Sequence, residues 1–504
     1  MKVMDGSQGL DKKTQAIQRI SKNFFFLLIA RIIDAGSQLL TISLVSRYLG
    51  AARYGDYGYI ISFAFLSISF TYLGLERIAI REISKDKTKS GQYLGTCIIV
   101  RWAYAVIGWL PMMGVILFLN LPSDIIWGIC ITNLALNFMG ESYIYFALFK
   151  AHEKMGYETL AAGVFQLLNI GAILSVKYFN MGFMPLFISL LIANFVRNVL
   201  CLIIAWRKFS PPSFRINFYL LKFFVKESYT LGLFILIGQA FVYIDLFILK
   251  AFKNTYEVSM FYGPHNFFLL LNIIPASLMA SIFPLLSRAA STDTAALTYG
   301  FEKSFRILAL GALFLVVLFV IFADQFVTIL FGKEFQGASR SFQIMAISLV
   351  FIIPFHAIEF TMVSINKQNF LFLCPLVGLL LRAILNFILI PKFGFIGASI
   401  AAASGYFFLF LTGFFLINGF VGTQPIHKLL LRPIIAAALI ALCLYPCNKI
   451  SMVVMLPLGL IMYTVSLLVT KSLSAGESQF LKVAVKKTGS ILCHKISSNR
   501  NTMC

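Results

Sequence analysis

Long apolar runs separated by short polar segments extend along the whole chain. Each run holds about 20 mostly apolar residues, as in ILALGALFLVVLFVIFA from Ile307, and an α-helix needs about this length to cross a bilayer. A membrane β-barrel would show shorter segments of alternating polarity. The pattern therefore predicts an all-α, polytopic membrane protein with about 14 transmembrane helices. We expect these helices at 23–47, 57–80, 93–118, 125–149, 157–176, 183–206, 227–249, 258–287, 305–331, 341–365, 369–390, 395–418, 429–447 and 450–470.

The composition agrees with a membrane protein and argues against nucleic acid as a partner. Only 12% of the residues are charged, whereas soluble domains carry about 25%. The formal net charge is +22, but most of the Lys and Arg residues fall in alternate connecting segments. This distribution is typical of cytoplasmic loops, so both termini are predicted to be cytoplasmic. Some of these basic residues are expected to contact anionic membrane lipids.

The polar segments also suggest how the chain is divided. The longest inner segment, 207–226, contains a Pro-Pro pair and five basic residues, and we interpret it as a linker between two lobes. The polar N-terminus has no signal-peptide core followed by a cleavage site, so we expect it to be uncleaved. The predicted parts are a cytoplasmic N-terminus at 1–22, an N-lobe at 23–206, the basic linker at 207–226, a C-lobe at 227–418, two extra helices at 419–470 and a basic cytoplasmic tail at 471–504.

The two predicted lobes carry matching stretches in the same order. YGYIISF at 57–63 matches YGPHNFF at 262–268, and Glu141 and Glu359 occupy corresponding helices. The separations stay between 205 and 218 residues, as for Tyr57 and Tyr262 or for the two glutamates. An even number of helices lies between the copies, so both have the same orientation. This predicts a parallel repeat of two six-helix lobes around a central cavity, one of the usual transporter symmetries.

A polar seam in the first predicted helix is the leading candidate site. Arg31, Asp34, Gln38 and Thr41 are spaced by three or four residues and therefore lie on one face of the helix. A charge at the bilayer centre costs at least about 2.5–3.5 kcal/mol, so these groups need a polar surrounding. One hypothesis is a cavity wall on which Arg31 binds an anionic substrate and Asp34 orients it. The alternative is a structural Arg–Asp pair that pins the helix to a neighbour.

Further charged residues in apolar segments extend the list. Arg197 and Arg382 lie deep and are predicted to join a cationic cavity lining, whereas Arg77 either guards the inner mouth or extends to the interface. Glu141, Glu359 and Asp245 are candidate ion-coupling residues, because a buried carboxylate can exchange a proton or hold sodium. Hydrogen bonding within a lobe is the alternative for the two glutamates.

Metal and cofactor sites are not expected. His356 and Glu359 are three residues apart, but one His and one Glu are too few for a metal site. The eight cysteines lie in predicted helices or in the tail and are interpreted as packing residues.

Three connecting segments resemble those of a known family. RYLGAARYGDYGYI at 47–60, LFGKEFQGA at 330–338 and the LN…PKFGFIGAS stretch at 385–399 resemble turns of polysaccharide-type flippases, such as O-antigen flippases. These belong to the multidrug/oligosaccharidyl-lipid/polysaccharide exporter superfamily. The resemblance implies two lobes that open a central cavity alternately to each side of a bacterial cytoplasmic (inner) membrane. Many members have twelve helices, and the resemblance assigns no role to the two extra helices predicted here.

The function that the resemblance implies is outward flipping of a polyprenyl-pyrophosphate-linked oligosaccharide, an O-antigen, capsule or exopolysaccharide repeat unit. Arg suits this substrate because its planar, permanently charged fork binds phosphate oxygens in pairs. The expected partners are this lipid-linked oligosaccharide, membrane lipids, a proton or sodium ion and other polysaccharide assembly proteins. A multidrug or other lipid exporter is the alternative. An enzyme, such as a glycosyltransferase or polymerase, is disfavoured because the outer loops are short and contain no catalytic motif.

Overall fold

The structure, a computed structural model, describes residues 5–470 apart from 120, 216, 423–425 and 448–449, and within this range it is built of helices without a strand. Nine helical stretches in the described part are long and apolar enough to cross a membrane, or up to ten if one bent pair forms a single span. An all-α, multi-pass membrane protein is therefore confirmed, whereas the count of about 14 helices stays a prediction. The predicted tail at 471–504 lies outside the described residues.

The helices follow one another along the chain with short connections. They are α1 Asp5–Tyr72, α2 Leu75–Lys85, α3 Ser90–Phe118, α4 Ser123–Ala151, α5 Gly156–Tyr178, α6 Pro185–Lys208, α7 Phe218–Phe252, α8 Thr255–Leu271, α9 Ile273–Thr292, α10 Thr294–Ile321, α11 Ala323–Phe331, α12 Ser339–Ser364, α13 Leu373–Val421, α14 Ile426–Leu444 and α15 Met452–Val469. The loop between α6 and α7 is shorter than the linker predicted at 207–226, because α6 ends at Lys208 and α7 already begins at Phe218.

Two glycines break the longest helices. Within α1 the backbone leaves helical geometry at Gly50 (φ 64°), and within α13 it does so at Gly394 (φ 56°). A positive φ strains residues that carry a Cβ, so glycine is the natural residue at both points. These breaks lie between the helices predicted at 23–47 and 57–80, and between those predicted at 369–390 and 395–418. Each long helix is therefore two shorter helices that meet at a glycine.

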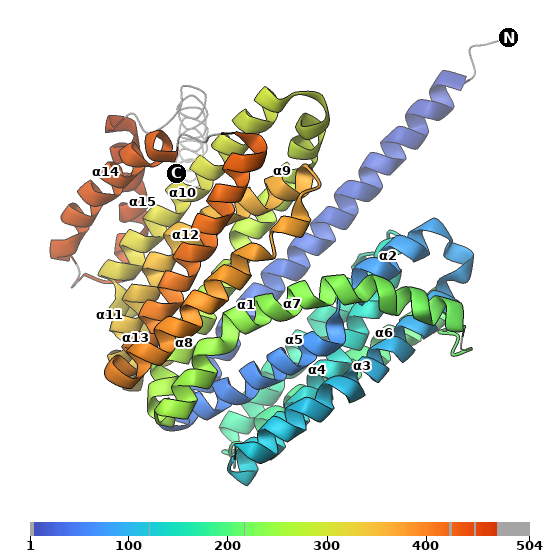
Figure 1. The fold of residues 1–504 in the computed structure, drawn as a ribbon, viewed down its shortest axis with the longest axis horizontal. Helices are drawn as coiled ribbons and strands as arrows, with labels where there is room; N and C mark the ends of the chain where they lie inside the picture. The colour runs from blue at the N-terminus through green and yellow to red at the C-terminus, as the bar shows by residue number, and fades with distance from the viewer. Residues whose placement is uncertain (1–4, 120, 216, 423–425, 448–449, 471–504) are drawn as a thin grey trace, which may run out of the picture.

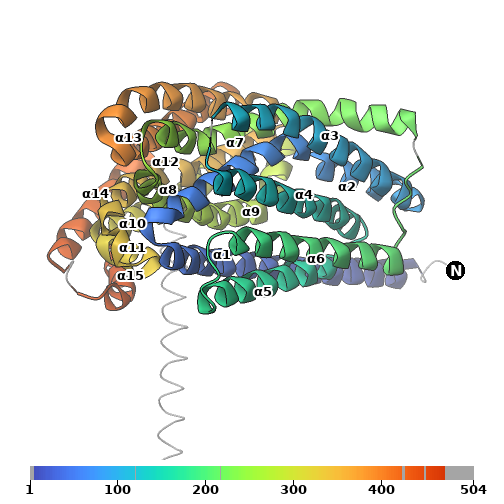
Figure 2. The ribbon, with the colours of Figure 1, turned by 90° about the horizontal axis from the view of Figure 1, so that it is seen from below.

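The helices form two groups that approach each other at one end (Figure 1). The first group contains α1, α2, α3, α4, α5 and α6, and the second contains α8, α9, α10, α12 and α13; Figure 2 shows the same arrangement from below. α7 packs against both, since it contacts α2 and α3 as well as α13. At the end where α7 leads into α8 the groups meet, and at the other end they lie apart (Figure 1).

The groups meet where the two copies of the repeat motif pack together. The part of α1 after Gly50 lies against α8, and a Cβ on Gly58 would lie 2.4 Å from the ring of Tyr262. Such a close approach requires the missing side chain of glycine. Segments 57–63 and 262–268, which match in sequence, thus lie at the contact between the two groups, as expected for elements on either side of a symmetry axis.

The two extra C-terminal helices lie at the edge of the second group. α14 and α15 pack on α10 through a cluster that includes Ala436, Ile440 and Leu318. The Tyr463 hydroxyl donates a hydrogen bond of 2.8 Å to the Leu310 carbonyl, which satisfies a buried phenol. These helices are therefore an addition to the outside of the bundle and do not contribute to the cavity described below.

Candidate functional site

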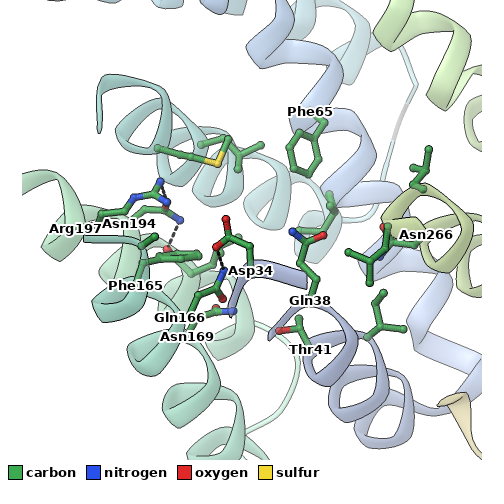
Figure 3. A pocket seen from close by; sticks show the side chains of 18 of the residues that line it. Asp34, Gln38, Thr41, Phe65, Phe165, Gln166, Asn169, Asn194, Arg197 and Asn266 are labelled. Carbon is green, nitrogen blue, oxygen red and sulfur yellow. Dashed lines mark hydrogen bonds between the residues drawn. The ribbon is translucent and has the colours of Figure 1, made fainter. Parts of the chain in front are cut away.

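A cavity of about 670 Å³ lies between the two groups of helices. Most of its wall comes from α1, α4, α5 and α6 of the first group. The second group and α7 contribute a smaller face with Tyr243, Tyr262 and Asn266. Figure 3 shows that the labelled side chains of the first group gather on one side of the cavity and that Asn266 approaches from the other. The cavity is therefore asymmetric, and its chemistry is set mainly by the first group.

The polar seam of α1 lies on this wall. Arg31, Asp34, Gln38 and Thr41 all line the cavity. The Gln166 amide of α5 donates a hydrogen bond of 3.0 Å to Asp34 Oδ1 (Figure 3). Among the described residues no ion pair joins Arg31 to Asp34, so the local pair that would pin the helix is not formed. The binding role predicted for the seam stays a prediction, but its side chains are placed to serve it.

Arg197 of α6 is a buried cation that faces the cavity. Its exposed fraction is only 5%, and its Nη2 donates a hydrogen bond of 2.7 Å to Asn194 Oδ1 (Figure 3). The guanidinium carbon lies 4.5 Å from the centre of the Phe165 ring and 5.9 Å from that of Tyr143, which fixes the plane of the group. Within the described part of the chain, Arg197 forms no ion pair and its Nε has no hydrogen-bond partner.

A buried charge without a charged partner is costly. Arg197 keeps its charge at any physiological pH because a guanidinium does not lose its proton. The aromatic contacts hold the fork in one orientation before a ligand arrives, which lowers the cost of ordering it. Arg197 is therefore oriented to donate hydrogen bonds to a group in the cavity, and its predicted role in substrate binding stays a prediction.

Sequence reasoning missed a second charged cluster at the same cavity. Lys150 at the end of α4 lies 2.8 Å from Glu76 Oε1 and 3.3 Å from Glu158 Oε1. All three residues line the cavity. Residues 150–156 were expected to be a loop, but α4 extends to Ala151 and α5 begins at Gly156, which puts Lys150 and Glu158 on helix ends facing each other. This cluster carries one positive and two negative formal charges, so Arg31 and Arg197 are the cations of the lining that lie outside it.

Amide side chains supply the remaining polar surface of the wall. Gln166, Asn169 and Asn194 lie on it beside Gln38, and Asn266 faces them (Figure 3). An amide offers both donors and an acceptor and therefore suits hydroxyl groups, which also do both. Tyr57, Tyr143 and Tyr243 add aromatic surface. The cavity thus combines a cationic position with a surface suited to sugars.

The structure places Arg382 and Asp245 away from this cavity. Both are completely buried where α7 packs on α13, and there Arg382 Nε donates a hydrogen bond of 2.7 Å to Asp245 Oδ1 and Nη2 donates to Oδ2. Asn386 donates a further hydrogen bond of 2.5 Å to Asp245 Oδ1. Arg382 was predicted to join the cavity lining, and the structure does not place it there. The guanidinium permanently neutralises Asp245, so a coupling ion would first have to displace it.

The remaining candidates also lie outside the cavity lining. Glu141 accepts hydrogen bonds from Trp102 Nε1 (2.9 Å) and from the Tyr145 hydroxyl (3.3 Å), a packing role within the first group. Glu359 lies 3.2 Å from His356 Nδ1 on the same helix. Arg77 is exposed at the start of α2, while its neighbour Glu76 faces the cavity. In the described residues no group of three or more His, Cys, Asp or Glu side chains could hold a metal ion.

Comparison with known sequences finds a family and two relatives. The sequence model of the family described as "Polysaccharide biosynthesis protein" matches residues 20–290, more than half of the 504-residue chain. The chain is 24% identical over 419 residues to the "Putative O-antigen transporter" of Shigella flexneri, a match covering 76% of this chain and 94% of that protein. It is 26% identical over 275 residues to the "Uncharacterized membrane protein MJ1068" of Methanocaldococcus jannaschii, which covers 51% of this chain and about half, 54%, of that protein.

Two solved structures share the fold. The "Lipid II flippase MurJ, inward closed conformation" has a TM-score of 0.72 at 16% identity and covers 88% of this chain and 97% of its own. An inward-facing multidrug resistance MATE family transporter of the MOP superfamily has a TM-score of 0.59 at 15% identity, with 78% and 94% covered. The relatives with a functional name are transporters and a flippase, which confirms the predicted resemblance. The chain belongs to the polysaccharide biosynthesis protein family.

Proposed function

We propose that the protein flips a polyprenyl-pyrophosphate-linked oligosaccharide from the inner to the outer leaflet of a bacterial cytoplasmic membrane. The observation that carries this proposal is the buried guanidinium of Arg197, which faces the cavity without a carboxylate partner in the described residues. Arg197 binds the pyrophosphate, and Arg31 on the same wall assists it. Both termini are on the cytoplasmic side in this proposal, as the basic loops predict.

The amide and tyrosine side chains of the wall bind the first sugars of the oligosaccharide. Sugar hydroxyls donate and accept hydrogen bonds, and Gln166, Asn169 and Asn194 offer both kinds of group beside the cationic position. The polyprenyl tail stays in the lipid, so only the polar head enters the cavity. Family membership and the O-antigen transporter among the relatives support a substrate of this class.

The cycle is coupled to ion binding, with a proton or sodium ion as the coupling ion. The structure favours Asp34 over Asp245 for this role, because Asp245 is held by Arg382 and Asp34 accepts one hydrogen bond in the open cavity. A negative Asp34 repels the pyrophosphate, and a protonated or cation-bound Asp34 does not. Ion binding at Asp34 would therefore change the affinity of the cavity for its anionic substrate.

Lipid transfer in proteoliposomes tests the proposal. A labelled lipid-linked oligosaccharide is supplied on one side, and its appearance on the other is measured for the wild type, Arg197→Lys and Arg197→Gln at matched protein levels. We expect Gln to lower transfer about tenfold or more and Lys to retain part of it, since charge-assisted hydrogen bonds are lost or reduced.

Arg207→Gln is the matched control, because Arg207 is an exposed residue in the last turn of the same helix. If Arg197→Gln transfers the lipid at the wild-type rate, Arg197 is not the pyrophosphate-binding residue. If the wild type itself moves no lipid-linked sugar but exports a drug or another lipid, the exporter alternative replaces the proposal.

A further inference from the structure

A second, much smaller cavity lies within the second group of helices, behind α8. Its volume is about 10 Å³, and residues of α8, α12 and α13 line it. α8 presents Asn266 and Leu269 to the large cavity, whereas His265 and Asn272 line the small one. Within the described residues the two cavities share no lining residue. The small cavity is therefore a separate feature, on the side of α8 away from the candidate site.

His265 brings a polar atom without a partner to this cavity. The side chain is only 3% exposed. Its ring stacks on that of Phe261 at 5.2 Å and meets that of Tyr243 edge-on at 6.3 Å, measured between centroids. In the described part of the chain its Nε2 is buried and has no hydrogen-bond partner. A buried polar atom left unpaired costs free energy, and bound water is a usual partner for such atoms.

Asn272 and Ser348 add oxygen acceptors to the same lining. The Asn272 Nδ2 donates hydrogen bonds of 3.3 Å to the carbonyls of Phe268 and Leu269, so the amide cannot be turned over without setting oxygen against oxygen. This leaves Oδ1, which is buried and has no partner among the described residues. The Ser348 hydroxyl donates to the Met345 carbonyl at 2.6 Å, which leaves its lone pairs able to accept.

The size and charge of the cavity select its guest. A volume of about 10 Å³ is the space that one water molecule requires. Among the described residues no carboxylate lines the cavity, and the Arg382 guanidinium carbon lies 5.4 Å from the ring centre of the lining residue Tyr406. A cation would thus meet a positive charge nearby without a carboxylate ligand, and an anion would meet the oxygen of Asn272. Water is neutral and both donates and accepts.

We propose that this cavity binds one water molecule, which donates to Asn272 Oδ1 and bridges His265 Nε2 and the Ser348 hydroxyl. The water joins α8 to α12 and supports the helix whose other face carries Asn266 at the large cavity. The site does not depend on the proposed transport function, because only residues behind the cavity wall form it.

Oxidation of methionines by radicals made from water in a brief X-ray pulse tests the site, because such radicals react beside the water that produced them. Met345 lines the small cavity. Met362, on the same helix, is buried as well and lines neither cavity, so it is the matched reference. In the purified protein in nanodiscs we expect Met345 to form its sulfoxide roughly tenfold faster than Met362, since oxidation follows access to the oxidant.

Two variants remove the water in different ways. Ser348→Thr adds one methyl group, about the size of the water, and keeps the hydroxyl. Asn272→Leu replaces the amide by an apolar side chain of similar volume. In both we expect oxidation of Met345 to fall to the rate of Met362. Ser364→Thr is the matched control, because Ser364 is also buried on α12 and also donates to the carbonyl three residues before it, at 2.7 Å.

Three results would overturn the water site. The first is equal oxidation of Met345 and Met362 in the unaltered protein. The second is fast oxidation of Met345 that persists in a folded Ser348→Thr protein, because the radicals would then come from bulk solvent. The third is slower oxidation of Met345 when sodium chloride replaces choline chloride at the same concentration, since a cation would then occupy the cavity. Ser348→Thr decides the test even if Asn272→Leu folds poorly.

Discussion

Two deeply buried arginines, one in each group of helices, have opposite surroundings. Arg382 lies in the second group, fully enclosed, and its Nε and Nη2 donate to Asp245. Arg197 lies in the first group against two aromatic rings and an amide, at the wall of the cavity. The first charge is compensated by a carboxylate, whereas the second has no carboxylate partner among the described residues, and we propose that it is compensated by the substrate. Two arginines buried to a similar depth can thus differ in role, and the presence or absence of a carboxylate partner is what distinguishes the structural pair from the proposed binding residue.

The largest expected effect is on the stability of the second group. Arg382→Met leaves Asp245 as a buried charge without its cation, and breaking such a pair costs about 3–5 kcal/mol. We expect a clearly lower unfolding temperature in detergent, measured by the intrinsic fluorescence of the purified protein. The double variant Asp245→Leu/Arg382→Met should recover most of the loss, since neither charge remains. A double variant as unstable as the single one would contradict the assignment of a self-contained pair.

Asp34→Asn should raise the affinity of the cavity for an anion. Asn keeps an acceptor for Gln166 but removes a negative charge near Arg197. From the loss of this one charge we expect the affinity of the cavity for an anion to rise about threefold. Equilibrium binding of a polyprenyl pyrophosphate measures the change, and outward transfer should at the same time lose its dependence on the ion gradient. Weaker binding in Asp34→Asn would instead show that this carboxylate orients the cationic groups.

Arg197→Gln should be close to neutral for folding, in contrast to Arg382→Met. Removing a buried charge that has no carboxylate partner in the described residues costs no ion pair, so we expect the free energy of unfolding to change by less than about 1 kcal/mol. The same fluorescence measurement is used. A loss as large as that of Arg382→Met would mean that Arg197 is a structural residue, which would abolish the comparison.

The smallest effect is expected at Glu141. Glu141→Gln retains an acceptor for Trp102 and Tyr145, and the side chain does not line the cavity. Lipid transfer should stay within about twofold of the wild type at each ion gradient tested, because the residue packs within its own group. Loss of gradient dependence in this variant would restore Glu141 as the ion-coupling residue.

Part of the site could be predicted because the spacing of polar residues along one helix is enough to show which of them share a face. Arg31, Asp34, Gln38 and Thr41 share a helix face by the period of the helix, and this face does line the cavity. The breaks at Gly50 and Gly394 likewise fall in the gaps between the predicted helices, at 48–56 and 391–394. No local sequence pattern predicts which distant segments contact each other.

The partners of the charged residues could not be read from the sequence. Arg382 and Asp245 are 137 residues apart, and Glu334 accepts a hydrogen bond from the backbone N–H of Ala51, 283 residues away. Their pairing depends on how helices pack, so a buried arginine in a sequence does not reveal whether a carboxylate faces it. Lys150 and Glu158 were missed for a different reason. The ends of helices are predicted only to within a few residues, and a shift of this size decides whether Lys150 lies on a helix at the cavity or in a loop.

Binding of a polyprenyl pyrophosphate without sugar, measured at equilibrium in nanodiscs, tests the central claim most directly. Wild type, Arg197→Gln, Arg197→Lys and the exposed control Arg207→Gln are compared at one salt concentration. The account predicts that Arg197→Gln weakens binding about tenfold or more, that Lys restores part of the affinity and that Arg207→Gln has no effect. Equal affinities for wild type and Arg197→Gln would contradict it, because the unpaired guanidinium would then not be the site of the anion.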